Sequence, residues 1–84
     1  MPEISRFYGI VIEMRPRDHL PPHFHARCGD DRILVHIADG TIIGSFPKSK
    51  LALVRSWLEL HRAELLDNWT LLQRKKQPRY IEPL

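Results

Sequence analysis

The chain has 84 residues, of which 43% are hydrophobic and 27% charged, and its formal net charge is +3. This length allows one domain over residues 1–84, and the composition excludes a fully disordered chain or a coiled-coil rod. No apolar run approaches the roughly 20 residues of a membrane span, and no signal peptide is recognisable at the start. With one cysteine, Cys28, we expect a cytoplasmic protein with no membrane partner. The mild positive charge permits a nucleic-acid partner without requiring one.

The first half of the chain predicts an antiparallel sheet of three or four strands. Ile, Val and Phe recur there between short segments rich in Gly, Pro and Asp, which is typical of strands and turns. Alternate residues from Tyr8 to Met14 are expected to share one apolar face. The predicted strands cover residues 7–14, 23–28, 32–37 and 41–46, and a Pro-rich link covers residues 15–22.

Two turns define the expected register of this sheet. Asp39-Gly40 is a strong two-residue hairpin signal, and a second two-residue turn is expected at Asp30-Asp31. This register places His25 directly opposite His36, on the face of the sheet that is turned away from the helices. The side chains expected to lie together on that open face are those of His23, His25, Arg27 and His36.

The second half of the chain predicts two helices packed on one face of the sheet, so the fold class is α+β. Apolar residues recur there at helical spacing among Ala, Glu, Arg and Lys. One helix over this span would be about 40 Å long, which is more than so small a domain is expected to cover. We therefore predict helices at about 49–60 and 62–74, with a break near His61, and one bent helix is the alternative. The Pro-containing tail, residues 77–84, is expected to be extended.

The densest chemical segment lies between residues 15 and 27, where three histidines, three arginines and an aspartate occur. Histidines at positions i and i+2 of a strand point to the same side. One interpretation is metal-independent acid–base cleavage of RNA, because an imidazole can both accept and donate a proton near neutral pH. The candidate acid–base residues are His23, His25 and His36, and the candidate phosphate contacts are Arg17 and Arg27.

Two other interpretations of this segment are open. His19, His23 and His25, with Asp18 or His36 as a further ligand, offer donor atoms for zinc or another divalent metal, although their spacing is not a standard signature. Alternatively, the segment is a solvated surface, or a patch that binds phosphate or protein without chemistry. The acid–base interpretation requires no cofactor, whereas the second requires a metal ion.

Several blocks of the sequence carry a resemblance to a known family. One is Asp18-His19 followed by Pro21-Pro22-His23-Phe24-His25, another is the Glu-Leu-His-Arg…Asn-Trp block between residues 57 and 69, and the chain closes on Ile-x-Pro-Leu. In these blocks the chain resembles, over essentially its whole length, the bacterial family called domain of unknown function 4160. The resemblance marks a signature region that consists of Asp18, His19, Pro21, Pro22, His23, Phe24 and His25.

The resemblance implies a role but no catalytic set. The family is similar to small cytoplasmic proteins encoded beside a second small protein, in what look like toxin–antitoxin pairs. It implies that the present chain is the candidate toxin of such a pair. From the His/Arg-rich strand face we expect this toxin-like component to act on RNA, or to bind nucleic acid, through that face. A cognate antitoxin-like protein is the expected partner, and a homodimer is compatible with the thin core of a chain this short. The alternatives are a non-enzymatic adaptor or regulator that binds RNA, DNA or protein, and a small metal-binding domain.

Overall fold

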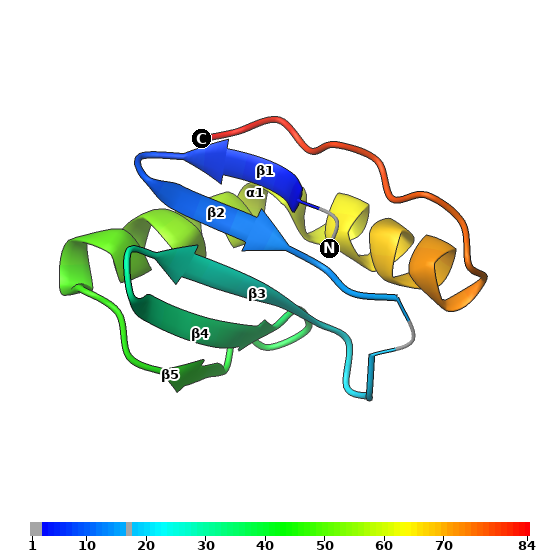
Figure 1. Ribbon diagram of the computed structural model, residues 1–84, viewed down its shortest axis with the longest axis horizontal. Coiled ribbons are helices and arrows are strands. Elements are labelled where there is room, and N and C mark those ends of the chain that lie inside the picture. The colour runs from blue at the N-terminus through cyan, green and yellow to red at the C-terminus, as the bar shows by residue number, and fades with distance from the viewer. Residues whose placement is uncertain (1–2, 17) are drawn as a thin grey trace.

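The computed structural model describes residues 3–16 and 18–84, and its fold is α+β, as predicted. The described residues form a five-stranded antiparallel sheet, in which each strand pairs with its neighbour in sequence, and one helix behind it (Figure 1). The prediction of three to four strands and two helices is therefore wrong in number. The elements are β1 (Glu3–Phe7), β2 (Ile10–Glu13), β3 (His23–Cys28), β4 (Asp31–His36), β5 (Ile42–Gly44) and α1 (Lys48–Gln73).

The additional strand arises because the predicted strand 7–14 is interrupted by a turn at Tyr8-Gly9. Both residues have positive φ, 50° and 77°, as a two-residue hairpin turn with the right-handed sheet twist requires. Tyr8 is therefore 63% exposed and does not share the core face on which it was expected, whereas Ile10 and Met14 are fully buried there. The turn was missed because Asn or Gly usually occupies the position of Tyr8.

The β3–β4 hairpin differs from the expected register by two residues. Its turn is at Gly29-Asp30, so His25 pairs with Leu34 and His36 pairs with His23. Because side chains alternate with a period of two, a shift of two residues changes the partners but not the faces. The predicted apolar face is confirmed, whereas the predicted pairing of His25 with His36 is wrong.

The β4–β5 connection is also longer than predicted. His36 N–H donates to the Thr41 carbonyl at 2.9 Å, and Gly40 N–H donates to the His36 carbonyl at 2.9 Å. The loop therefore spans residues 37–40 instead of the two residues expected, and Val35 pairs with Ile42. In this register β5 ends at Gly44, where a φ of 113° and the backbone of β4 leave no room for a side chain.

The core lies between the sheet and α1, and Trp57 is at its centre. Its indole is fully buried, with ring centroids 5.4 Å from Phe7 and 5.6 Å from Phe24. The indole N–H donates to the Glu82 carbonyl at 2.9 Å, so this core residue also binds the C-terminal tail. An aromatic side chain of this size, buried and with its polar atom satisfied, is a main source of the hydrophobic stabilisation of so small a domain.

The predicted break near His61 is a kink at which two helical segments of α1 meet. His61 alone within it has non-helical backbone angles (φ −123°, ψ 20°), so the chain bends there without ending the helix. On either side of the bend, Arg62 pairs with Glu59 and donates to the Ile37 carbonyl at 2.9 Å. The alternative of one bent helix, which the sequence left open, is therefore the one observed. Although α1 is long, it is not apolar enough to cross a membrane.

The C-terminal tail has no regular secondary structure and folds back along α1 to the edge of β1 (Figure 1). Asn68, which is 1% exposed, donates to the Arg79 carbonyl and accepts from the Arg79 N–H, both at 2.8 Å. Two residues later, the Ile81 N–H donates to the Ile4 carbonyl at 2.8 Å. The tail therefore covers the β1 edge of the sheet, which would otherwise present unpaired backbone groups.

We expect Asn68→Ala to lower the free energy of unfolding by about 2 kcal/mol, because two hydrogen bonds to the tail are lost together. Urea unfolding followed by circular dichroism measures the change. Gln73→Ala, on an exposed position of the same helix, is the control and should change little. Equal stability of the two variants would show that Asn68 does not hold the tail.

We expect Tyr8→Asn to raise the free energy of unfolding by about 1 kcal/mol, because asparagine tolerates the left-handed backbone that tyrosine adopts at a cost. Thermal unfolding of the variant tests this. Tyr8→Phe keeps the ring and the strain, so it should match the natural chain. A lower melting temperature for Tyr8→Asn would mean that the exposed ring stabilises the turn.

Candidate functional site

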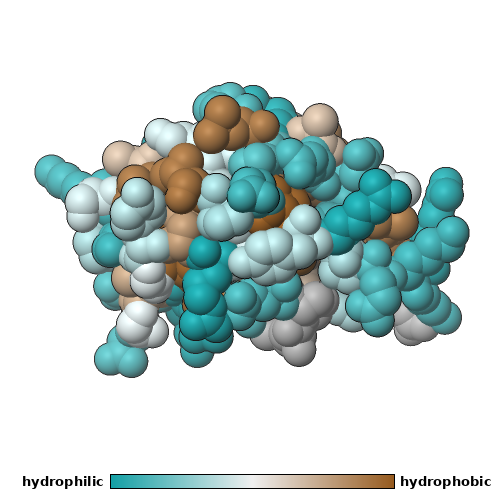
Figure 2. Space-filling view, turned by 90° about the horizontal axis from the view of Figure 1, so that it is seen from above, coloured by the Kyte–Doolittle hydropathy of each residue, from teal (hydrophilic) through white to brown (hydrophobic). Residues whose placement is uncertain are grey.

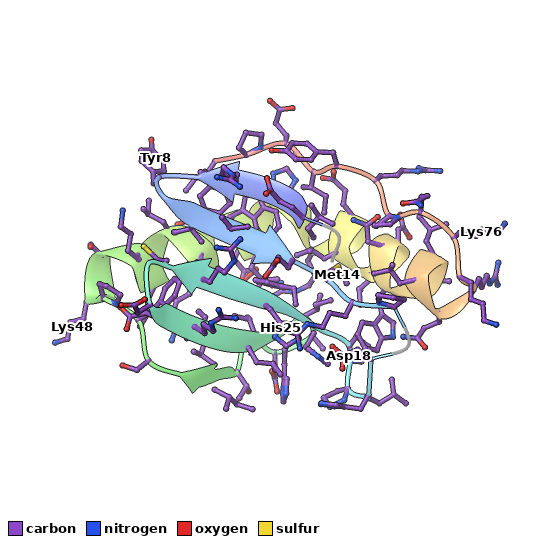
Figure 3. The ribbon with its side chains drawn as sticks, in the orientation of Figure 1. Tyr8, Met14, Asp18, His25, Lys48 and Lys76 are labelled. Atoms are coloured by element: carbon purple, nitrogen blue, oxygen red, sulfur yellow. The ribbon has the colours of Figure 1, made fainter. Side chains whose placement is uncertain are left out.

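The candidate site lies where the Pro-rich link between β2 and β3 meets the first residues of β3. The link contributes Asp18, and β3 contributes His23 and His25, which alternation places on the same side of the strand. Figure 3 shows His25 on β3 with Asp18 beside it in the link. Residues that are five and seven positions apart in sequence thus meet at one point.

The carboxylate of Asp18 is the centre of this cluster. Its Oδ2 atom lies 2.9 Å from His23 Nε2 and 3.1 Å from His25 Nε2. Its other oxygen, Oδ1, accepts the backbone N–H of His19 at 3.0 Å, which fixes the orientation of the carboxylate. One ligand atom from each of Asp18, His23 and His25 therefore lies within 4.8 Å of the other two.

His23 is buried, contrary to the expectation that the imidazoles share an open face. Only 1% of this residue is exposed, and its ring centroid lies 5.3 Å from that of Trp69 on α1. The reason is that His23 begins β3 at the point where α1 and the link both cover the strand. Its Nδ1 donates to the Pro21 carbonyl at 2.8 Å, which leaves Nε2 directed at Asp18.

His25 is more accessible than His23, with 20% of its side chain exposed. Burial lowers the pKa of this imidazole more than the bond to Asp18 raises it, and the positive field of Arg15 lowers it further. Partial burial alone would raise the pKa of the Asp18 carboxyl. The hydrogen bonds from His25, from the His19 backbone and from His23 outweigh that effect and hold this pKa below its usual range.

The structure does not bring together all the residues predicted to form the site. His36 is the Cα partner of His23, but it is not one of the three residues whose ligand atoms converge. Arg27 points its guanidinium at Glu13, with 3.5 Å between Nε and Oε1. The candidate phosphate contact Arg17 lies outside the described residues.

His19 is also displaced from the role proposed for it as a metal ligand. Its side chain is 74% exposed, and its Nε2 atom lies 3.9 Å from the Oδ1 atom of Asp18. In the described residues Asp18 takes the third position of the cluster, which the metal hypothesis had given to His19 with Asp18 as an option. Sequence spacing could not separate them, because the path of the link decides which side chain turns towards β3.

Arg15 is a neighbour of the cluster that sequence reasoning did not single out. If the β2–β3 pairing of Glu13 with His25 is continued by two residues, Arg15 lies across from His23 on the same face. Its Nε atom is buried and has no hydrogen-bond partner among the described residues. Nothing in the sequence distinguished this arginine from the others in the segment.

The arrangement of Asp18, His23 and His25 matches what a divalent transition metal requires. Two imidazole nitrogens and one carboxylate oxygen point inward, and the second nitrogen of His23 is bonded to a backbone carbonyl. Such an outer hydrogen bond fixes the tautomer and the ring orientation of metal-binding histidines. Three protein ligands also leave positions for water or a substrate.

Comparison with known proteins yields one match. A family model described as a domain of unknown function, DUF4160, matches residues 9–70, which include the whole cluster and most of α1. No curated protein and no solved structure matches the chain. The expected family resemblance is thus confirmed.

Proposed function

The chain belongs to the DUF4160 family, and we propose that it functions by binding one divalent transition-metal ion through Asp18, His23 and His25. The observation that carries this proposal is the convergence of the three ligand atoms within 4.8 Å of one another. The cluster is partly buried, which is typical of a built site and unusual for a chance grouping on a solvated surface.

The hydrogen bonds of His23 support a metal ion at this point. Its Nδ1 faces a carbonyl oxygen and must donate, so Nε2 carries the only lone pair that can bind a metal. This nitrogen lies 2.9 Å from Oδ2 of Asp18, so the lone pair of Nε2 and the carboxylate oxygen would face the same ion.

The donor atoms indicate which metals fit. Imidazole nitrogens favour zinc, iron, nickel, cobalt or manganese over calcium and magnesium, which prefer all-oxygen sites. Two histidines and one carboxylate on one side of the ion are typical of sites that keep open positions for reaction. We therefore propose a site of the catalytic kind. Its ion would supply Lewis-acid chemistry or activate a bound water.

Burial of His23 argues against the metal-independent mechanism with two histidines. A general acid or base must come within hydrogen-bond reach of the substrate, and the His23 side chain is fully enclosed. His36 is not in the cluster, so it offers no replacement. His25 alone would remain, and one imidazole does not supply both an acid and a base in the same step.

We expect the purified, chelator-treated protein to bind one zinc or manganese ion per chain in isothermal titration calorimetry. Loss of a residue that only hydrogen-bonds to a metal ligand weakens metal binding by roughly 10–100-fold. Because His25→Ala and Asp18→Asn each change a ligand itself, each should weaken binding by more than that. His36→Ala, on the neighbouring strand but outside the cluster, is the matched control. Circular dichroism verifies that each variant is folded.

Two outcomes would contradict the metal site. One is a folded natural chain that binds none of the transition metals with defined stoichiometry. The other is His25→Ala and Asp18→Asn binding the ion as tightly as His36→Ala does. In either case the cluster would be a hydrogen-bonded structural element.

A toxin-like role in a bacterial two-gene module is a second proposal, favoured by a cationic surface beside the link. A cavity of about 340 Å³ there is lined by Pro16, Lys75 and Lys76, among others. Lysines grouped in this way suit a nucleic-acid backbone. An antitoxin-like protein would then be the partner that masks the site.

Inducible expression in bacteria tests the toxin-like role. We expect the natural chain to slow growth and to alter total RNA, because an RNA-directed site would act on cellular transcripts, and His25→Ala to remove both effects at equal protein level. His36→Ala should remain active. Normal growth and intact RNA on expression of the natural chain would instead favour a non-enzymatic adaptor or regulator.

A further inference from the structure

A second recognition element, the guanidinium of Arg15, lies beside the proposed metal ligands. We infer that the site takes a phosphodiester of a nucleic-acid strand, whose phosphate would be held by Arg15 together with a metal ion on Asp18, His23 and His25. This inference rests on the proposed function, because the metal ion supplies half of the phosphate contact. It adds the chemical class of the ligand and the residue that selects it.

Arg15 is placed and unpaired in the manner that an anion site requires. Arg15 follows β2 by two residues, and its positive charge is close enough to His25 to lower the pKa of that imidazole. Its Nε atom is buried without a partner among the described residues, and a buried donor that makes no hydrogen bond destabilises the folded chain. An oxygen of a bound anion would satisfy this donor. The planar guanidinium group of arginine can also bind two oxygens of one phosphate through two parallel N–H bonds.

The nearby carboxylates do not provide that oxygen. Asp18 already accepts both imidazoles, and Glu13 faces Arg27. With a divalent ion bound, the negative charge of the Asp18 carboxylate would not neutralise the positive charges of the ion and of Arg15. The site would therefore keep an excess positive charge. An anionic ligand is therefore favoured over a neutral one.

The surroundings favour a strand of nucleic acid over a single small anion. Pro16, next to Arg15 in the chain, lines the cavity of about 340 Å³ that also includes Lys75 and Lys76. In Figure 3, Lys76 lies at the right, past the end of α1, and Asp18 lies lower in the view, in the link. The Lys76 N–H donates to the Leu71 carbonyl at 2.9 Å, which anchors this backbone at the end of α1. A free phosphate ion at the metal would contact Arg15 but not the lysines. A nucleic-acid strand would also place its neighbouring phosphates near Lys75 and Lys76.

Two probes and the zinc-loaded protein test the inference. Inorganic phosphate is titrated by calorimetry, and a short single-stranded RNA with 2′-O-methyl groups, which prevent cleavage, is titrated by fluorescence anisotropy. Arg15→Met should weaken both ligands by at least about tenfold, since a hydrogen bond to a charged group is lost. Arg32→Met, an exposed arginine on the outer face of β4, is the matched control and should change neither.

A double variant, Lys75→Met with Lys76→Met, separates the two parts of the ligand. It should weaken the RNA and reduce the salt dependence of its binding, because fewer phosphates are neutralised. It should leave inorganic phosphate unchanged. Equal RNA affinity of the double variant and the natural chain would overturn the strand assignment.

The outcomes also separate this inference from the metal site. If zinc binds normally to Arg15→Met but phosphate affinity is unchanged, Arg15 does not select the ligand and the present inference fails alone. If zinc does not bind the natural chain at all, the metal site fails, and the shared phosphate contact fails with it. Titration of zinc into each variant before the ligand distinguishes the two cases.

Discussion

One carboxylate holds the candidate site together. Asp18 accepts hydrogen bonds from two imidazoles of β3 through a single oxygen, and its other oxygen is fixed by the His19 backbone. The link between β2 and β3 is thereby fastened to the strand that follows it. The sheet by itself does not determine the burial of His23 or the orientation of His25, and both depend on this contact with the link.

The histidines are held from the opposite side by the core. His23 rests against Trp69, and on the same helix Asn68 binds the C-terminal tail, which pairs with β1. The site is thus attached to α1 as well as to the sheet. Ligands held by packed elements keep their geometry better than ligands on a free loop, which matters most for a metal ion because its bond lengths tolerate little variation.

The exposed surface shows no single large apolar area on the face seen in Figure 2. In the view of Figure 2, hydrophilic residues cover most of the visible face, and the apolar areas between them are separated from one another. Exposed large apolar side chains such as Leu20, Ile43 and Leu60 come from the link, from β5 and from α1. Single exposed apolar residues of this kind are common on protein surfaces and do not by themselves mark a docking site.

The sequence by itself determined the fold class, the apolar face of the sheet, the bounds of β3 and the segment in which the candidate site lies. These features depend on local periodicity and on residue type, which a single chain displays directly. It also located the irregular position of α1 at His61, and it left open whether the span forms two helices or one bent helix. The Tyr8-Gly9 turn was missed because tyrosine is a poor residue for a left-handed backbone.

Only the tertiary structure decided which polar side chains meet. A shift of two residues in the β3–β4 register separated His25 from His36, and the path of the link brought Asp18 to the cluster while His19 remained exposed. Register and loop path depend on contacts between residues far apart in space, such as His23 with Trp69. Sequence spacing does not encode those contacts, so it predicted the donor residues but not the set that they form.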